Sequence, residues 1–144
     1  LIQIFVIFLR ESIKINMLIN IPVSVDELVD KITILEIKKI KIKDKNKLLN
    51  VNREYKYLKE ILRKKIKISL KIKNEILALK KINLKLWNIE DKKRKAEKNK
   101  KFDSAFIKYA RNVYIYNDIR AKIKHNINVL AGSKIIEEKS YSRY

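Results

Sequence analysis

The sequence contains no cysteine and only one glycine, one proline, one histidine and one tryptophan. Without cysteine, the chain can form no disulfide, no thiolate metal site and no cysteine nucleophile. The lone His125 cannot build a zinc site, and one glycine excludes the glycine-rich phosphate loops of P-loop and dinucleotide-binding proteins. The scarcity of glycine and proline also argues against a turn-rich all-β fold. We therefore expect no metal and no cofactor.

Acidic residues are scarce as well. The chain has 36 Lys and Arg residues against 16 Asp and Glu, a net charge of +20. Residues 38–101 alone carry 25 basic and 7 acidic side chains, hence +18. A basic region of this kind can bind nucleic-acid phosphates. However, most of these residues are lysine, which AT-rich codons encode, and arginine, the better bidentate ligand of phosphate, is not enriched. Genomic base composition would explain the charge without any ligand.

Residues 1–9, LIQIFVIFL, are apolar or neutral but too few to span a bilayer. They also lack the basic leading region and the cleavage site of a signal peptide. Because the chain begins with leucine and Met17 follows, we expect residues 1–16 to be a non-native or upstream extension. Residues 17–144 would then form a single helical domain. The alternative is that residues 1–16 form an amphipathic membrane anchor.

The residues after Met17 predict a first helical hairpin. Ser24 with Glu27 three residues later predicts a capping box, which starts a helix that runs to about residue 42. The stretch KDKNK, residues 43–47, is predicted to be a turn, and a second amphipathic helix follows it. An antiparallel arrangement places apolar residues opposite one another at three levels. These pairs are Leu28 with Leu62, Ile32 with Leu58, and Leu35 with Tyr55.

Residues 65–73, KIKISLKIK, alternate apolar and charged residues, which alone would suggest a strand, but their place between two helical seams favours a helix break or connector. A second hairpin is predicted after it. Its first helix has the seam Ile72, Ile76, Leu79, Asn83, Leu86 and Glu90. Its second helix is capped by Asp103 or Ser104. It ends at Gly132, because the residue that follows a helix often has a positive φ, which glycine adopts readily. The tail after Gly132 is not helical by pattern. The fold is therefore expected to be all-α, with about four helices as two antiparallel, coiled-coil-like hairpins and short extended terminal segments.

The seam of the last predicted helix contains one charged residue. From Phe102 to Leu130, residues spaced four and three apart are apolar or aromatic except Arg120. If the second hairpin folds back at about residue 101, Arg120 lies near Asn83, and Glu90 lies near Arg111. A buried arginine without an acceptor would cost several kcal/mol. We therefore predict a polar network or anion site made of Asn83, Glu90, Asp91, Arg111, Asn117, Asp118, Arg120 and Lys124.

Several blocks of the sequence together resemble a bacterial family known only as a domain of unknown function. The blocks are IPVSVDELVDKITILEIK, LWNIED, ARNVYIYNDIRAKIKHNIN and EEKSY. The resemblance covers roughly residues 18–141 and implies no activity. The family pattern that it implies includes Asp30, Lys31, Glu36, Arg53, Glu54, Asn83, Trp87, Glu90, Asp91, Arg111, Tyr114, Asn117, Asp118, Arg120, Lys124, Asn128 and the residues Glu137 to Tyr141.

Three functions remain open at this stage. The first is a non-enzymatic helical protein-interaction or scaffold module that binds a protein partner or self-associates. The second is nucleic-acid backbone binding through the Lys-rich residues 38–101. The third is a small anion-binding enzyme, in which Arg111, Arg120 and Lys124 converge on the ligand. We expect a soluble cytoplasmic protein with no membrane partner.

Overall fold

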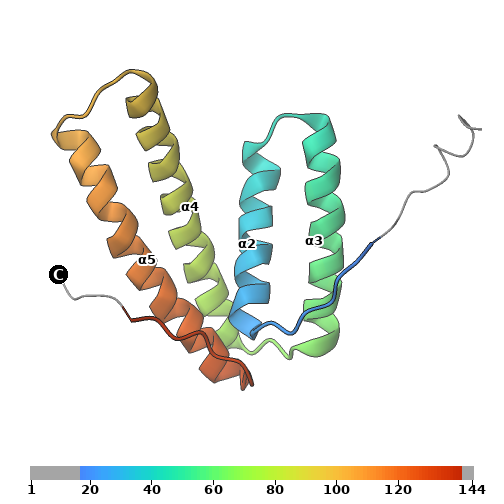
Figure 1. The fold of residues 1–144 in the computed structure, drawn as a ribbon. Coiled ribbons are helices and arrows are strands. Elements are labelled where there is room, and N and C mark those ends of the chain that lie inside the picture. Colours follow the sequence, from blue (N-terminus) through green and yellow to red (C-terminus); the bar gives the residue numbers. More distant parts are fainter. Residues whose placement is uncertain (1–16, 141–144) are drawn as a thin grey trace, which may run out of the picture.

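A computed structural model describes residues 17–140 of the chain. The expected extension at residues 1–16 and the last four residues lie outside this range. The described part contains four helices and no strand: α2 Val25–Lys41, α3 Lys45–Lys65, α4 Leu70–Lys98 and α5 Ser104–Ala131. They form two antiparallel hairpins, α2 with α3 and α4 with α5 (Figure 1). The predicted all-α class and two-hairpin arrangement are confirmed. None of these helices is long and apolar enough to cross a bilayer.

The helix ends follow local sequence signals. Asp44 caps α3 by accepting a hydrogen bond from the backbone N–H of Lys47 at 2.8 Å. Asp103 caps α5 by accepting from the backbone of Ala105 and Phe106, at 3.0 and 3.2 Å. Gly132 ends α5 with a φ of 64°, a conformation that glycine adopts at little cost. Residues 66–69 form the connector between the hairpins. The predicted connector, the predicted cap at Asp103 and the predicted helix end at Gly132 are therefore confirmed. Residues 45–47, which were predicted to lie in a turn, already belong to α3 because Asp44 caps it there.

The register of the second hairpin also agrees with the prediction that it folds back near residue 101. Asn126 of α5 donates a hydrogen bond to Glu75 of α4 at 3.4 Å. Further along, the ammonium of Lys85 lies 5.4 Å from the centroid of the Tyr116 ring. Near the hairpin tip, Lys92 lies over the ring of Tyr109 at 5.3 Å. These cross-helix pairs fix which residues of α4 face α5.

Helix α2 is the centre of the molecule. It packs against α3, α4 and α5, whereas among the described helices α3 packs only against α2. The core joins residues from all four helices: Val29, Ile32, Leu62, Leu79, Ile82 and Ile127. Because α2 has neighbours on two sides, it buries a second stripe besides the predicted apolar one. That stripe is Asp26, Asp30, Thr33 and Ile37, spaced four, three and four residues apart.

Candidate functional site

The first polar cluster lies where α2 meets the second hairpin. The Arg120 guanidinium forms a salt bridge with the Asp30 carboxylate, and its Nε donates to Asp30 Oδ1 at 3.2 Å and to Asn83 Oδ1 at 2.9 Å. Asn83 in turn donates to Asp30 Oδ1 at 2.8 Å and to Thr33 Oγ1 at 2.9 Å. Asp30, Thr33 and Asn83 are buried. The acceptor that Arg120 requires is therefore supplied by α2, the helix of the other hairpin.

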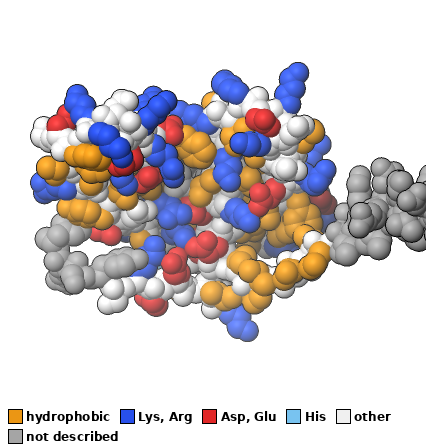
Figure 2. Space-filling model, turned by 45° about the horizontal axis from the view of Figure 1, so that its top comes forward, with side chains coloured by type: hydrophobic (Ala, Val, Ile, Leu, Met, Phe, Trp, Pro, Cys, Tyr) orange, Lys and Arg blue, Asp and Glu red, His pale blue; other side chains and the backbone are white. Residues whose placement is uncertain are grey.

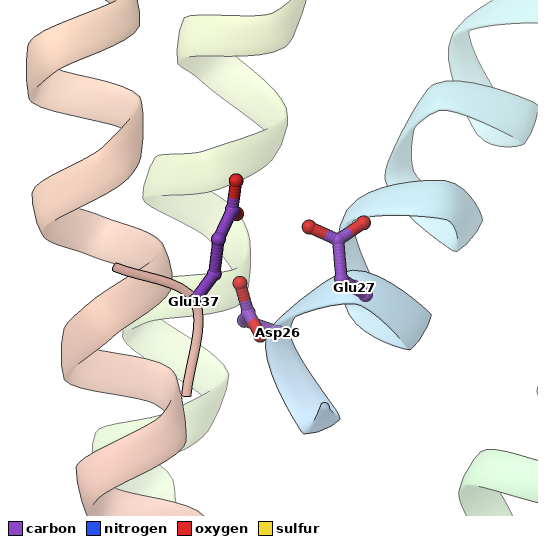
Figure 3. A group of neighbouring side chains, drawn as sticks. All are labelled: Asp26, Glu27 and Glu137. Atoms are coloured by element: carbon purple, nitrogen blue, oxygen red, sulfur yellow. The ribbon is translucent and has the colours of Figure 1, made fainter. Parts of the chain in front are cut away.

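The second cluster surrounds Lys124, one turn further along α5. The Lys124 side chain is only 5% exposed, and its Nζ lies 3.3 Å from Asp26 Oδ2 and 3.2 Å from Glu137 Oε2. The ammonium also forms a salt bridge with Glu27. Asp26 and Glu27 belong to the first turn of α2, and Glu137 belongs to the C-terminal tail (Figure 3). Lys124 of α5 thus joins the C-terminal tail to the first turn of α2, which is 97 residues away in the sequence at Glu27.

The electrostatics of this second cluster favour the charged forms of its members. Burial alone would lower the pKa of Lys124, but hydrogen bonds to Glu27 and Glu137 and the charge of Asp26 raise it overall. Burial would raise the pKa of Asp26, but hydrogen bonding by Ser24 and Asn128 and the charge of Lys124 lower it. The hydrogen bond from Lys124 also lowers the pKa of Glu137.

Carboxylate oxygens of Asp26, Glu27 and Glu137 lie within 4.8 Å of one another, a grouping that would suit a hard cation. In the folded protein the Lys124 ammonium already contacts all three carboxylates. The cation of this cluster is therefore the ammonium itself.

The first turn of α2 departs from the predicted capping box. Ser24 does occupy the N-cap position, but its hydroxyl donates to the Asp26 carboxylate and accepts from no backbone N–H of the helix. The N–H of Val25 donates instead to Ser133 Oγ at 3.2 Å, and that of Asp26 donates to Asn128 Oδ1 at 2.9 Å. The capping box was wrong because Glu27 is engaged by Lys124. The end of α5 caps α2 in its place.

The remaining members of the predicted network lie apart from these clusters. Glu90 pairs with Lys93 of its own helix at 3.0 Å, and among the described residues no ion pair joins it to Arg111. Asp91, Arg111 and Asp118 occupy exposed positions, and Asn117 is half-buried. The structure therefore brings Asn83 and Arg120 together in one cluster, and Lys124 forms the second cluster one turn further along α5.

The apolar seams predicted from the sequence do not reveal the carboxylates that pair with Arg120 and Lys124. Although the family resemblance names Asp30 and Glu137, the apolar seam predicted for α2 does not include Asp26, Asp30 or Thr33. Their spacing of four and three residues, continued by Ile37, was the available signal of a second buried face. Glu137 gave no periodic signal because it lies in a tail without regular structure.

A cavity of about 220 Å³ lies beside the second cluster. Its charged lining consists of Asp26, Glu137 and Glu138 together with Lys122, Lys124 and Lys139. Since acidic and basic groups balance there, and Arg120 and Lys124 are engaged by carboxylates, the arrangement does not concentrate positive charge for a small anion. Within the described residues, the ion pairs of Arg120 and Lys124 with α2 instead join the two hairpins.

The chain belongs to a family of unknown function, DUF6165, whose model matches residues 9–144. No curated protein and no solved structure matches the chain. The family match includes residues 9–16, which we had expected to lie outside the domain. The start of the domain at residue 17 therefore stays a prediction.

Proposed function

We propose that the protein is a non-enzymatic helical interaction module, which presents an extended apolar segment to a partner protein. The segment is residues 17–23, before α2. The observation that carries the proposal is its exposure: the side chains of Met17, Leu18, Ile19, Ile21 and Val23 are 51–75% exposed. Exposed apolar patches of this kind on a folded domain mark interaction sites.

The backbone of the segment supports the same proposal. Residues 17–23 have no helical structure, and their N–H and C=O groups form no backbone hydrogen bond with the described part of the chain. A partner with an open sheet edge can bind such a segment as an added strand, while pockets on the partner bind the side chains of the segment. Isoleucine and valine suit that conformation, whereas Pro22 limits the pairing near α2.

The internal polar clusters give the module its rigidity. Asp26, just after the segment, is held to α5 through Asn128 and Lys124, and the Ser24 hydroxyl donates to the Asp26 carboxylate. The segment therefore leaves the body at a fixed point, which lowers the entropy that binding must overcome. In this view Arg120 and Lys124 are structural residues that position the binding segment.

The experiment is site-specific photo-crosslinking in cells, with the photoreactive residue at position 18 of the full chain. We expect a discrete crosslinked product, which disappears when Ile19 and Ile21 are both changed to Asp. The matched control is Val129→Asp, since Val129 is also exposed but lies at the end of α5. A product that survives the double change, or the absence of any product, would overturn the proposal. The mass of the product distinguishes another protein from a second copy of this chain.

A further inference from the structure

The two hairpin tips lie at the same end of the molecule, although they are far apart in the sequence. The first tip, residues 38–49, consists of the loop between α2 and α3 with the adjoining helix ends. The second tip, residues 92–107, consists of the loop between α4 and α5 with its adjoining helix ends (Figure 1). The connector 66–69 and the N-terminus of α2 lie at the opposite end. A flat partner that reaches one tip can therefore reach the other.

Both tips are strongly basic. The first contains six Lys and one Asp, and the second contains seven Lys and Arg residues with one Glu and one Asp, so that each carries +5. Many of these basic groups have no carboxylate partner within the described residues. They include Lys43, Lys45 and Lys47 in the first tip and Arg94, Lys95 and Lys98 in the second. Their charges remain available to an anionic partner.

Each tip also exposes large apolar side chains among its lysines. Ile40 and Leu49 in the first tip are 67% and 63% exposed, and Phe102 and Ile107 in the second are 52% and 58% exposed. Figure 2, in which the tips come forward, shows hydrophobic side chains beside the basic ones. Each of the four lies within about one helical turn of the loop that joins the two helices of its hairpin, roughly 5 Å along the axis. This distance matches the depth of about 5–10 Å to which apolar side chains enter a membrane interface.

We propose that the two tips together form a docking surface for an anionic lipid bilayer. The lysines contact the headgroups while the four apolar side chains enter the interface. A nucleic-acid backbone would satisfy the lysines equally well, but phosphates and sugars offer nothing to an exposed isoleucine or leucine. The apolar residues at both tips therefore favour the lipid surface. From the sequence we expect no membrane partner, whereas the tertiary fold brings the two basic, apolar tips to one end of the molecule.

Two contacts keep the tips in a fixed relation. Within the first tip, Lys41 Nζ donates to Asn88 of α4 at 3.0 Å, which ties the end of α2 to the second hairpin. Deeper in the molecule, Lys80 of α4 pairs with Glu36 of α2 at 2.7 Å. Two weak contact sites on one rigid body bind a common surface more tightly than either alone.

The test is co-sedimentation of the full chain with vesicles of phosphatidylcholine, with and without phosphatidylglycerol. We expect binding only to the anionic vesicles, and its loss in high salt. The variant Ile40→Ser/Ile107→Ser, with one change in each tip, should bind about tenfold more weakly because it loses the apolar insertion. The matched control, Val129→Ser/Leu130→Ser, removes two exposed apolar side chains from the end of α5 and should bind as wild type. Residues 1–9 are present in all three proteins and cannot account for a difference between them.

Equal binding by the tip variant and the control, or no preference for anionic vesicles, would overturn the proposal. The same three proteins are also titrated against labelled duplex DNA. Tight, salt-sensitive DNA binding that Ile40→Ser/Ile107→Ser leaves unchanged, without vesicle binding, would assign the tips to a nucleic acid. Unchanged thermal unfolding of the tip variant, followed by circular dichroism, shows that its surface and not its fold has changed.

Discussion

Arg120 of α5 and Asp30 of α2 are 90 residues apart in the sequence and form a salt bridge between the two hairpins. The carboxylate is buried, and the arginine side chain is 19% exposed. Asn83 of α4 contacts both, so that three helices meet in one polar layer. The layer requires each of its members, because removing one partner of a buried pair leaves the other without compensation.

The first prediction concerns this salt bridge. Arg120→Met should lower the free energy of unfolding by about 3–5 kcal/mol, because Asp30 and Asn83 lose the guanidinium. Arg120→Lys keeps the charge but loses the planar fork, and should cost less. Urea denaturation measures both. Arg111→Met, at an exposed position on the same helix, is the control and should change stability by less than about 0.5 kcal/mol. Equal effects at positions 111 and 120 would contradict the structural role of Arg120.

The second prediction concerns the cap that α5 supplies to α2. Asn128→Ala removes the acceptor for the Asp26 N–H and should destabilise the protein by about 1–2 kcal/mol. Hydrogen exchange should accelerate most in the first turn of α2. Asn46→Ala, at an exposed position in the first turn of α3, serves as the control. Unchanged exchange at residues 25–28 in Asn128→Ala would show that this acceptor does not hold the helix end.

The third prediction concerns the pH dependence of the Lys124 cluster. Asp26 and Glu137 have lowered pKa values, so their contribution is present above their ordinary values of 3.8 and 4.5 and is lost as the pH falls further. Lys124 has a raised pKa, so its contribution is present below 10.5 and is lost as the pH rises through the folded value. The stability difference between wild type and Lys124→Met should therefore be constant near neutrality and shrink at both extremes.

Urea denaturation of the two proteins across pH measures this difference. Glu137→Gln, which keeps the shape of the side chain, is a milder variant. It should flatten the acid limb and also weaken the alkaline limb, because the hydrogen bond to Glu137 contributes to the raised pKa of Lys124. A difference that is independent of pH would mean that Lys124 acts through packing and not through its charge.

The fourth prediction concerns the end of α5. A Cβ added at Gly132 would meet no atom within 4 Å, so the cost of Gly132→Ala comes from the backbone conformation alone. With φ at 64°, we expect a loss of about 1–2 kcal/mol. Gly132→Asn should cost less, since asparagine tolerates this region better. Thermal unfolding compares the two, and an Asn variant that loses as much as the Ala variant would argue against this explanation.

The sequence determined the parts of the fold that depend on neighbouring residues. Helical periodicity, the cap at Asp103 and the left-handed position of Gly132 are local, so they could be recognised without a structure. The cap at Asp44 is also local, although it falls in the stretch 43–47 that was predicted to be a turn. The register of the second hairpin followed from its fold-back point, which placed Asn83 near Arg120.

Only the tertiary structure decided how the two hairpins pack, because no periodicity within one hairpin specifies the face that meets the other. That packing makes α2 central, buries Asp26 and Asp30, and supplies the acceptors for Arg120 and Lys124. It also replaces the expected capping box with Asn128 and Ser133. Finally, it brings two basic tips to one end of the molecule, since charges separated in sequence act together only after the chain has folded.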